Sequence, residues 1–128
     1  EIGNPLSVAV QGVFSQATSG ADLADLISQK LSRQCLHIAP DSNKTISTVA
    51  WCSGGGQGFI ELAAEQGIDA FISGEVSEQT THIAREMDIH FFAAGHHATE
   101  RYGVKALGEH LAQQHQLDVV FVDIDNPV

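Results

Sequence analysis

The chain has 128 residues, the length of one domain, and its 43% apolar residues are enough for a core without disulfide or metal cross-links. The formal net charge is −10, from six Lys and Arg against sixteen Asp and Glu. This balance argues against binding through the phosphate backbone of nucleic acid, which needs clustered cations, and suits a divalent cation instead.

The two cysteines, Cys35 and Cys52, lie in apolar stretches without the CxxC spacing of a metal or redox motif. No apolar stretch is long enough to cross a bilayer, and nothing resembles a signal peptide. We therefore expect a cytoplasmic protein with buried, reduced thiols and no membrane partner.

The first 45 residues are expected to form a strand, a helix and a short strand. Residues 6–14, LSVAVQGVF, have the composition of a strand. Residues 19–33 have a helical pattern that places Leu23, Ile27 and Leu31 on the inner face. A short strand over 35–39 precedes PDSNKT, residues 40–45, which is typical of a turn or loop.

Three later segments share one plan. Residues 48–56, 69–75 and 90–97 are apolar runs of strand length that end at glycine, and a helical pattern follows each. Their strands start about 21 residues apart, a period that calls for parallel strands with right-handed crossovers. With a last strand over residues 118–124, the pattern predicts one α/β domain over residues 1–128: three layers, α/β/α, around a mostly parallel or mixed sheet of short βα units.

The helices carry marks of their ends and inner faces. Gly67 is placed to end a helix in the left-handed conformation, and Ser77 is a plausible N-cap for the next one. In the last helix, the spacing of Val104, Leu107 and Leu111 predicts that these three side chains are buried.

In an open parallel sheet, ligands bind outside the carboxyl ends of the strands. Here that edge is expected to carry the loop of Gly54, Gly55 and Gly56. Its backbone N–H groups could cradle an anion, which makes the three glycines our candidate for cofactor binding. The loop matches no dinucleotide or P-loop pattern, and the alternative is a tight turn that lets a helix pack closely on the sheet.

His96 and Glu100 are the candidate metal ligands at the same edge. Residues four apart share a helix face, whereas His97 is turned about 100° from His96. Imidazole and carboxylate are common ligands of first-row metals. The alternative is a polar helix start in which Glu100 interacts favourably with the helix dipole.

Glu75 lies one loop away from the histidines. If the strands are neighbours, Glu75 could orient a ligand or move a proton; the alternative is a solvated carboxylate before a helix. Asp123 and Asp125, at the end of the last strand, could approach the same edge or lie in a frayed tail. Five further histidines are scattered and are expected to be surface or packing residues: His37, His82, His90, His110 and His115.

Four segments carry a family resemblance: VAWCSGGGQGFI, DAFISGEVSEQT, FFAAGHHATER and the closing VVFVDIDNP. Together they resemble the C-terminal half of the NIF-three-like family, also called the GTP cyclohydrolase I type 2 homologue family, and are close to its bacterial YbgI branch. The resemblance covers nearly the whole chain from about Ser47 onward. It implies two similar α/β domains per full-length subunit, two divalent metal ions in the cleft between them and a ring-shaped hexamer. We therefore expect this chain to be the C-terminal half of a two-domain subunit.

The resemblance also implies roles for particular residues. The family motif that GHHATE resembles supplies metal ligands at the positions of His96 and Glu100, with His97 beside them as an outer-shell or substrate-facing group. The other family ligands, a His-His pair and an Asp, match no segment of this sequence. Many relatives carry histidine in place of Gln79, so we do not extend the site there.

These implications lead to one main hypothesis and two alternatives. The main hypothesis is a part of a dinuclear metal-dependent hydrolase that acts on a nucleotide or a related small molecule, with Glu75 or His97 moving protons. The first alternative is a metal-binding or ring-forming scaffold without catalysis. The second is a nucleotide-binding regulator that uses the triple-glycine loop. For this chain alone we expect weak or absent metal binding, because His96 and Glu100 are only two ligands, and self-association through an uncovered apolar face.

Overall fold

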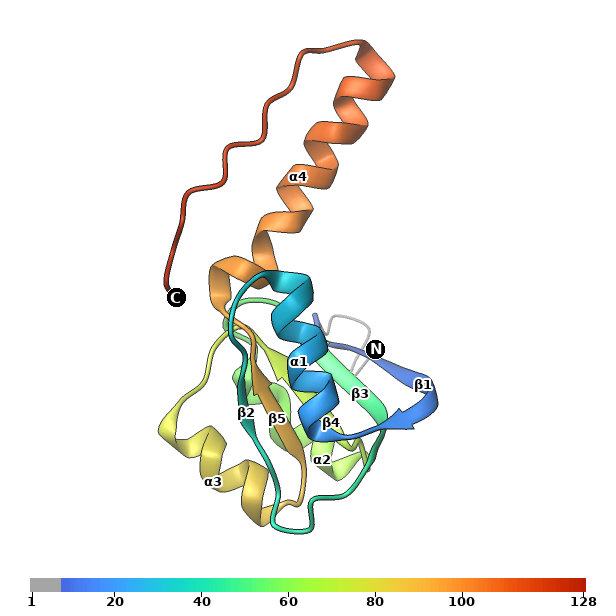
Figure 1. Cartoon of the computed structure of the whole chain (residues 1–128), viewed down its shortest axis with the longest axis vertical. Coiled ribbons are helices and arrows are strands. Elements are labelled where there is room, and N and C mark those ends of the chain that lie inside the picture. The colour runs from blue at the N-terminus through green and yellow to red at the C-terminus, as the bar shows by residue number, and fades with distance from the viewer. Residues whose placement is uncertain (1–7) are drawn as a thin grey trace.

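The computed structural model describes residues 8–128, which form a five-stranded mixed sheet with helices on both faces (Figure 1). The strand order is β1-β3-β4-β5-β2. The strands are β1 Val10–Thr18, β2 Leu36–Ile38, β3 Ile46–Cys52, β4 Ala70–Ser73 and β5 His90–Ala93. The helices are α1 Gly20–Leu31, the 3-10 turn η1 Gln57–Phe59, α2 Ile60–Glu65, α3 Glu78–Glu86 and α4 His96–His115.

The three central strands are parallel. Trp51 pairs with Ile72 between β3 and β4, and Ile72 pairs with Phe92 between β4 and β5. The edge strands β1 and β2 run antiparallel to β3 and β5, so the sheet is mixed. Because β3, β4 and β5 are parallel neighbours, their carboxyl ends meet at one edge.

Two hydrophobic cores lie on opposite faces of the sheet. Side chains alternate along a strand, so Phe71 and Phe91 face α2 and α3, where they pack with Ala63 and Ala84. On the other face, Phe92 and its neighbours pack against Leu23 of α1. The predicted three-layer α/β/α architecture is therefore confirmed.

Several local predictions are also confirmed. Gly67 has a positive φ of 73° after α2. Ser77 caps α3, with its backbone N–H donating to the Thr80 hydroxyl at 3.2 Å. Cys35 and Cys52 are free and buried, and burial raises the pKa of Cys35 to about 11.

The first strand spans 10–18 rather than 6–14, and residues 6 and 7 lie outside the described residues. Among residues 8–128, no helix has the length and apolar character needed to span a membrane.

Two predictions about the end of the chain are wrong. Val104, Leu107 and Leu111 are not buried; their exposures are 64%, 56% and 37%. Helix α4 leaves the body of the domain, and Ala98 is its one buried residue (Figure 1). Beyond its first turn α4 therefore has no sheet to pack against.

Residues 118–124 do not form a strand either. A strand needs a partner with free backbone groups, and this segment runs beside α4, whose backbone is hydrogen-bonded within the helix (Figure 1). It contacts α4 through side chains: Val119 reaches Gly108, and Phe121 lies beneath the Lys105 ammonium at 6.0 Å. We call this projecting unit, residues 104–124, the apolar arm.

Candidate functional site

Three loops meet at the carboxyl edge of the parallel strands. Residues 53–56 follow β3, and Gly74 and Glu75 follow β4. Two residues separate the end of β5 from His96, which begins α4. The backbone ties the loops together: Glu75 N donates to Gly54 O at 3.1 Å, and Gly95 N donates to Gly74 O at 3.0 Å. This edge holds the predicted site residues.

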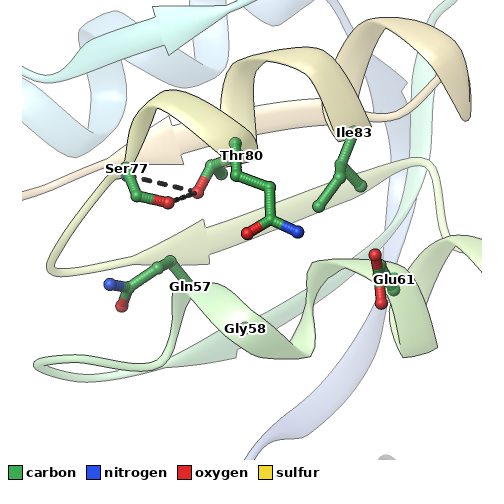
Figure 2. A pocket seen from close by; sticks show the side chains of 7 residues that line it. Gln57, Gly58, Glu61, Ser77, Thr80 and Ile83 are labelled. Atoms are coloured by element: carbon green, nitrogen blue, oxygen red, sulfur yellow. Dashed lines mark hydrogen bonds between the residues drawn. The ribbon is translucent and has the colours of Figure 1, made fainter.

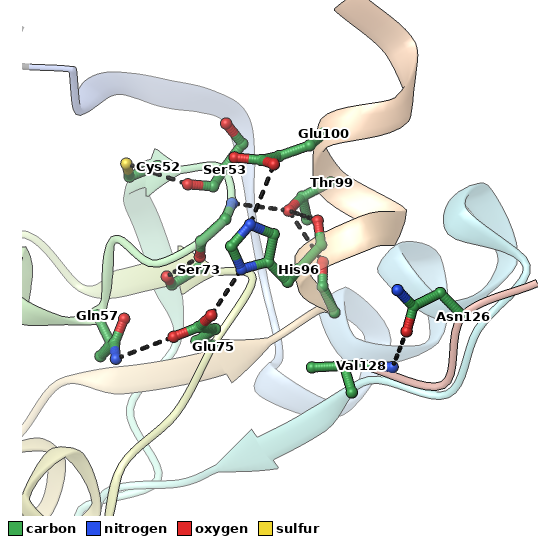
Figure 3. Close-up of polar contacts among 12 residues, drawn as sticks. Cys52, Ser53, Gln57, Ser73, Glu75, His96, Thr99, Glu100, Asn126 and Val128 are labelled. Carbon is green, nitrogen blue, oxygen red and sulfur yellow. Dashed lines mark hydrogen bonds and ion pairs between the residues drawn. The ribbon is translucent and has the colours of Figure 1, made fainter.

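The ring of His96 lies between two carboxylates (Figure 3). Its Nδ1 is 2.6 Å from Glu75 Oε1, and its Nε2 is 3.0 Å from Glu100 Oε2. The three side chains are partly exposed, at 38% for His96, 39% for Glu75 and 52% for Glu100. The predicted convergence of His96 and Glu100, and the approach of Glu75, are present in the structure.

The two carboxylates favour a positive charge on or beside the ring of His96. A neutral imidazole has one N–H, so it can donate to only one of the two carboxylates. The hydrogen bond to Glu75 raises the pKa of His96, and the charge and hydrogen bond of Glu100 raise it further. The same hydrogen bond lowers the pKa of Glu75, with a smaller contribution from Gln57. If Nδ1–H is donated to Glu75, Nε2 keeps a lone pair that faces the Glu100 carboxylate.

Gly54 makes this convergence possible. Its φ is +61°, and a Cβ there would overlap the Glu100 carboxylate and lie 3.1 Å from His96 Nε2. Its backbone N–H donates to the Thr99 hydroxyl at 3.0 Å, so the loop is held to the first turn of α4. Gly54 is therefore a close-packing residue beside the His96–Glu100 pair.

The other loop glycines support packing more than anion binding. A Cβ at Gly56 would lie 2.5 Å from Cys52 Sγ, and one at Gly55 would lie 3.5 Å from Glu75 Oε2. Carboxylates of Glu75 and Glu100 border the loop, which makes it an unfavourable place for a phosphate. Cofactor binding by Gly54, Gly55 and Gly56 stays a prediction, and the geometry favours the tight-turn alternative.

His97 is directed to a different partner. Its Nε2 is 2.8 Å from Asp123 Oδ1, and its backbone N–H donates to Val128 O at 3.1 Å. The other oxygen of Asp123 accepts from Arg101 at 2.9 Å, and the hydrogen bond from His97 is the largest cause of the lowered pKa of Asp123. His97 therefore holds the C-terminal segment, and it does not share the point where His96 and Glu100 converge.

Two pockets adjoin the site. One of about 410 Å³ is bordered by Arg33, Glu75 and Gly95, among other residues. A smaller one of about 150 Å³ lies between η1 and the start of α3, and Gln57, Ser77 and Gln79 are among its lining residues (Figure 2).

The residues of this chain can supply two ligands of a divalent metal site, but not a complete set. Within residues 8–128 no group of three or more His, Cys, Asp and Glu side chains is arranged to hold an ion. His96 Nε2 and Glu100 supply two suitable donors, whereas Glu75 faces the opposite ring nitrogen. Sequence reasoning missed Gln57 and Thr99, because their contacts depend on the fold. The available signals were the segments that carry the resemblance, since Gln57 lies in VAWCSGGGQGFI and Thr99 in FFAAGHHATER.

The fold and site define an α/β protein with a histidine–carboxylate cluster at the carboxyl edge of its parallel strands. Residues 5–127 match the model of the Duf34/NIF3 (NGG1p interacting factor 3) family. The chain belongs to this family, as the resemblance of its motifs implied.

Individual relatives agree with this assignment. The chain is 64% identical over 127 residues to a protein of Vibrio cholerae named "GTP cyclohydrolase 1 type 2 homolog", covering 98% of this chain and 50% of that protein. A solved structure titled "Structural genomics, protein ybgI, unknown function" is 49% identical, with a TM-score of 0.87, and covers 94% of this chain and 49% of that chain. A crystal structure of the protein TTHA1606 from Thermus thermophilus is 29% identical with a TM-score of 0.71, over 93% of this chain and 45% of that chain. The chain thus spans about half the length of the curated relatives that it matches.

Proposed function

We propose that His96 and Glu100 are two ligands of a divalent metal site that is completed by other residues in a protein of the relatives' full length. The observation that carries the proposal is the 3.0 Å approach of His96 Nε2 to Glu100 Oε2 at the edge where three strand ends meet. The chain spans about half the length of its curated relative, and its described residues offer two ligands and not a group of three or more; both facts support the same proposal. The identity of the metal and the number of ions, two in the family resemblance, belong to the proposal.

In this proposal the full-length protein is a metal-dependent hydrolase for a nucleotide or a related small molecule. A bound divalent ion supplies Lewis acidity and lowers the pKa of water. The residues of this chain prepare the site for it. Glu75 accepts the Nδ1–H of His96 and so leaves Nε2 free to bind, and the partly exposed Glu75 carboxylate is also placed to take up a proton. The pocket of about 410 Å³ beside Glu75 offers room for a small molecule.

A non-catalytic scaffold is the second candidate, and the apolar arm favours it. Val120, Val122 and Ile124 are 77%, 72% and 73% exposed, and they continue the exposed apolar residues of α4. An uncovered apolar surface of this kind is typical of an interface. Homo-oligomerisation, with a ring hexamer for the full-length form, belongs to this proposal, and so does a cytoplasmic location.

A measurement of nucleotide turnover separates the hydrolase from the scaffold. A full-length protein that carries this sequence would be loaded with Mn²⁺ or Zn²⁺ and offered GTP and other nucleotides, beside the same protein with His96→Ala. The hydrolase proposal predicts metal-dependent release of product that His96→Ala reduces by at least about a hundredfold. Metal binding without turnover of any nucleotide, in a protein that still assembles, would favour the scaffold.

A further inference from the structure

The amide of Gln57 lies behind the carboxylate of Glu75. Gln57 Nε2 donates to Glu75 Oε2 at 3.4 Å, while Glu75 Oε1 contacts His96 Nδ1 at 2.6 Å (Figure 3). Together with the contact of His96 to Glu100, these bonds form one chain of polar groups from η1 to α4. Gln57 directly follows the three loop glycines, Gly54, Gly55 and Gly56, and it is not one of the proposed metal ligands.

We propose that Gln57 is a positioning residue that holds Glu75 in the rotamer that orients His96. This inference rests on the proposed function and deepens it, because it assigns a further residue to the same metal site. Gln57 acts through Glu75 and touches neither the ion nor the substrate.

The surroundings of Glu75 show why such a support is needed. The backbone of Glu75 is fixed by its hydrogen bond to Gly54 O, but its side chain is 39% exposed. A carboxylate at such exposure has several accessible rotamers, and each change of rotamer would release the Nδ1 of His96. A hydrogen bond to the second carboxylate oxygen restricts that freedom, and a neutral amide does so without adding a charge that would repel the bound cation.

The orientation of the Gln57 amide is consistent with this role. Its Oε1 is buried and has no hydrogen-bond partner among the described residues. Flipping the amide would place that oxygen against the Glu75 carboxylate, where two acceptors repel. Buried acceptors without a partner are uncommon in folded proteins. The chain thus tolerates an unsatisfied carbonyl in order to place the N–H of Gln57 on Glu75.

The test uses the 128-residue chain with Gln57→Met, which keeps the length of the side chain and removes its N–H. Gln66→Met is the control, because Gln66 is an exposed glutamine at the end of α2. Long-range ¹H–¹⁵N spectra of the metal-free protein report the tautomer of neutral His96. We expect the Nδ1–H form to dominate in the wild type and in Gln66→Met, and to lose population in Gln57→Met.

Zn²⁺ affinity is the second readout. Removing an outer-shell partner of a metal ligand costs roughly 10- to 100-fold in affinity, so Gln57→Met, one step further out, should cost about 3- to 10-fold. If Gln57 acts through Glu75, the double variant with Glu75→Gln binds no more weakly than Glu75→Gln alone. Unchanged tautomer and affinity in Gln57→Met, or costs that add in the double variant, would overturn the inference. If a protein of the relatives' full length that carries this sequence binds no Zn²⁺, the proposed function fails, and the tautomer in the metal-free protein still decides the role of Gln57.

Discussion

The carboxylate of Glu75 and Nδ1 of His96, which come from neighbouring strand ends, lie 2.6 Å apart. This contact assigns different tasks to the two ring nitrogens of His96. Nδ1 is held by Glu75, and Nε2 is directed to Glu100. Metal-binding histidines in proteins commonly show this division, with a carboxylate on the nitrogen that does not bind the ion.

Replacing Gly54 should lower the stability of the domain. Gly54→Ala places a side chain at a φ of +61° and drives its Cβ into the Glu100 carboxylate. The left-handed conformation alone costs about 1–2 kcal/mol of unfolding free energy, and the overlap adds to it. Gly58→Ala is the control, because a Cβ there meets nothing within 4 Å, and it should change stability by less than about 0.5 kcal/mol. Urea unfolding measures both variants, and equal stability of the two would contradict this reading of the loop.

Asp123 is expected to hold the C-terminal segment against α4. It accepts from His97 at 2.8 Å and from Arg101 at 2.9 Å. Asp123→Asn should speed amide hydrogen exchange in residues 117–128 by several-fold, whereas Asp125→Asn should not. Within residues 8–128 the Asp125 carboxylate has no hydrogen bond or ion pair, so it serves as a matched neighbour. Identical exchange in both variants would show that the Asp123 contacts do not hold the segment.

The pair of half-buried His37 and buried His90 should make stability depend on pH. His90 Nε2 donates to Lys44 O at 2.7 Å, which leaves His90 Nδ1 to accept from His37 Nε2 at 3.0 Å. Burial, and then the neighbouring His90, lower the pKa of His37 below 6.5. The unfolded chain therefore takes up a proton at His37 more readily than the folded chain does, and the contribution of His37 to the free energy of unfolding falls as the pH drops below about 6.5.

Guanidinium unfolding at several pH values tests this dependence. His37→Phe, which can still stack on Phe92, should flatten the loss of stability between pH 7 and 5. His82→Phe is the control, because His82 is exposed on α3, and it should keep the wild-type slope. Parallel slopes for the wild type and His37→Phe would exclude His37 as the source.

The apolar arm should drive association of the isolated chain. Leu107 is 56% exposed in a run of apolar residues, whereas Leu26 is 46% exposed on α1. Sedimentation velocity should show a mass that rises with concentration for the wild type and for Leu26→Glu, and a monomer for Leu107→Glu. A wild-type chain that stays monomeric at high concentration would contradict association through the arm.

Sequence reasoning worked where the signal was local and periodic. Apolar runs that end at glycine predicted the parallel strands, and the i, i+4 spacing predicted that His96 and Glu100 share a point. Gly67 and Ser77 were recognisable because helix ends depend on one residue and its immediate neighbours.

The failures arose where the outcome depends on a partner. Residues 118–124 have the composition of a strand, but no strand lies beside them in the described part of the chain. Val104 and Leu107 have core spacing on a helix that leaves its core. The contacts of Gln57 with Glu75 and of His37 with His90 join distant segments, and no spacing in the sequence points to them.

Cadmium NMR tests the central claim most directly, because ¹¹³Cd²⁺ replaces other divalent ions and couples to the nitrogen that binds it. In a ¹⁵N-labelled protein of the relatives' full length that carries this sequence, we expect coupling to Nε2 of His96 and to no other histidine of residues 8–128. The affinity should fall at least about tenfold in Glu100→Gln and stay unchanged in Glu109→Gln, a glutamate further along α4. Coupling to His97, to Nδ1 of His96 or to no histidine of these residues would contradict a metal site built on His96 and Glu100.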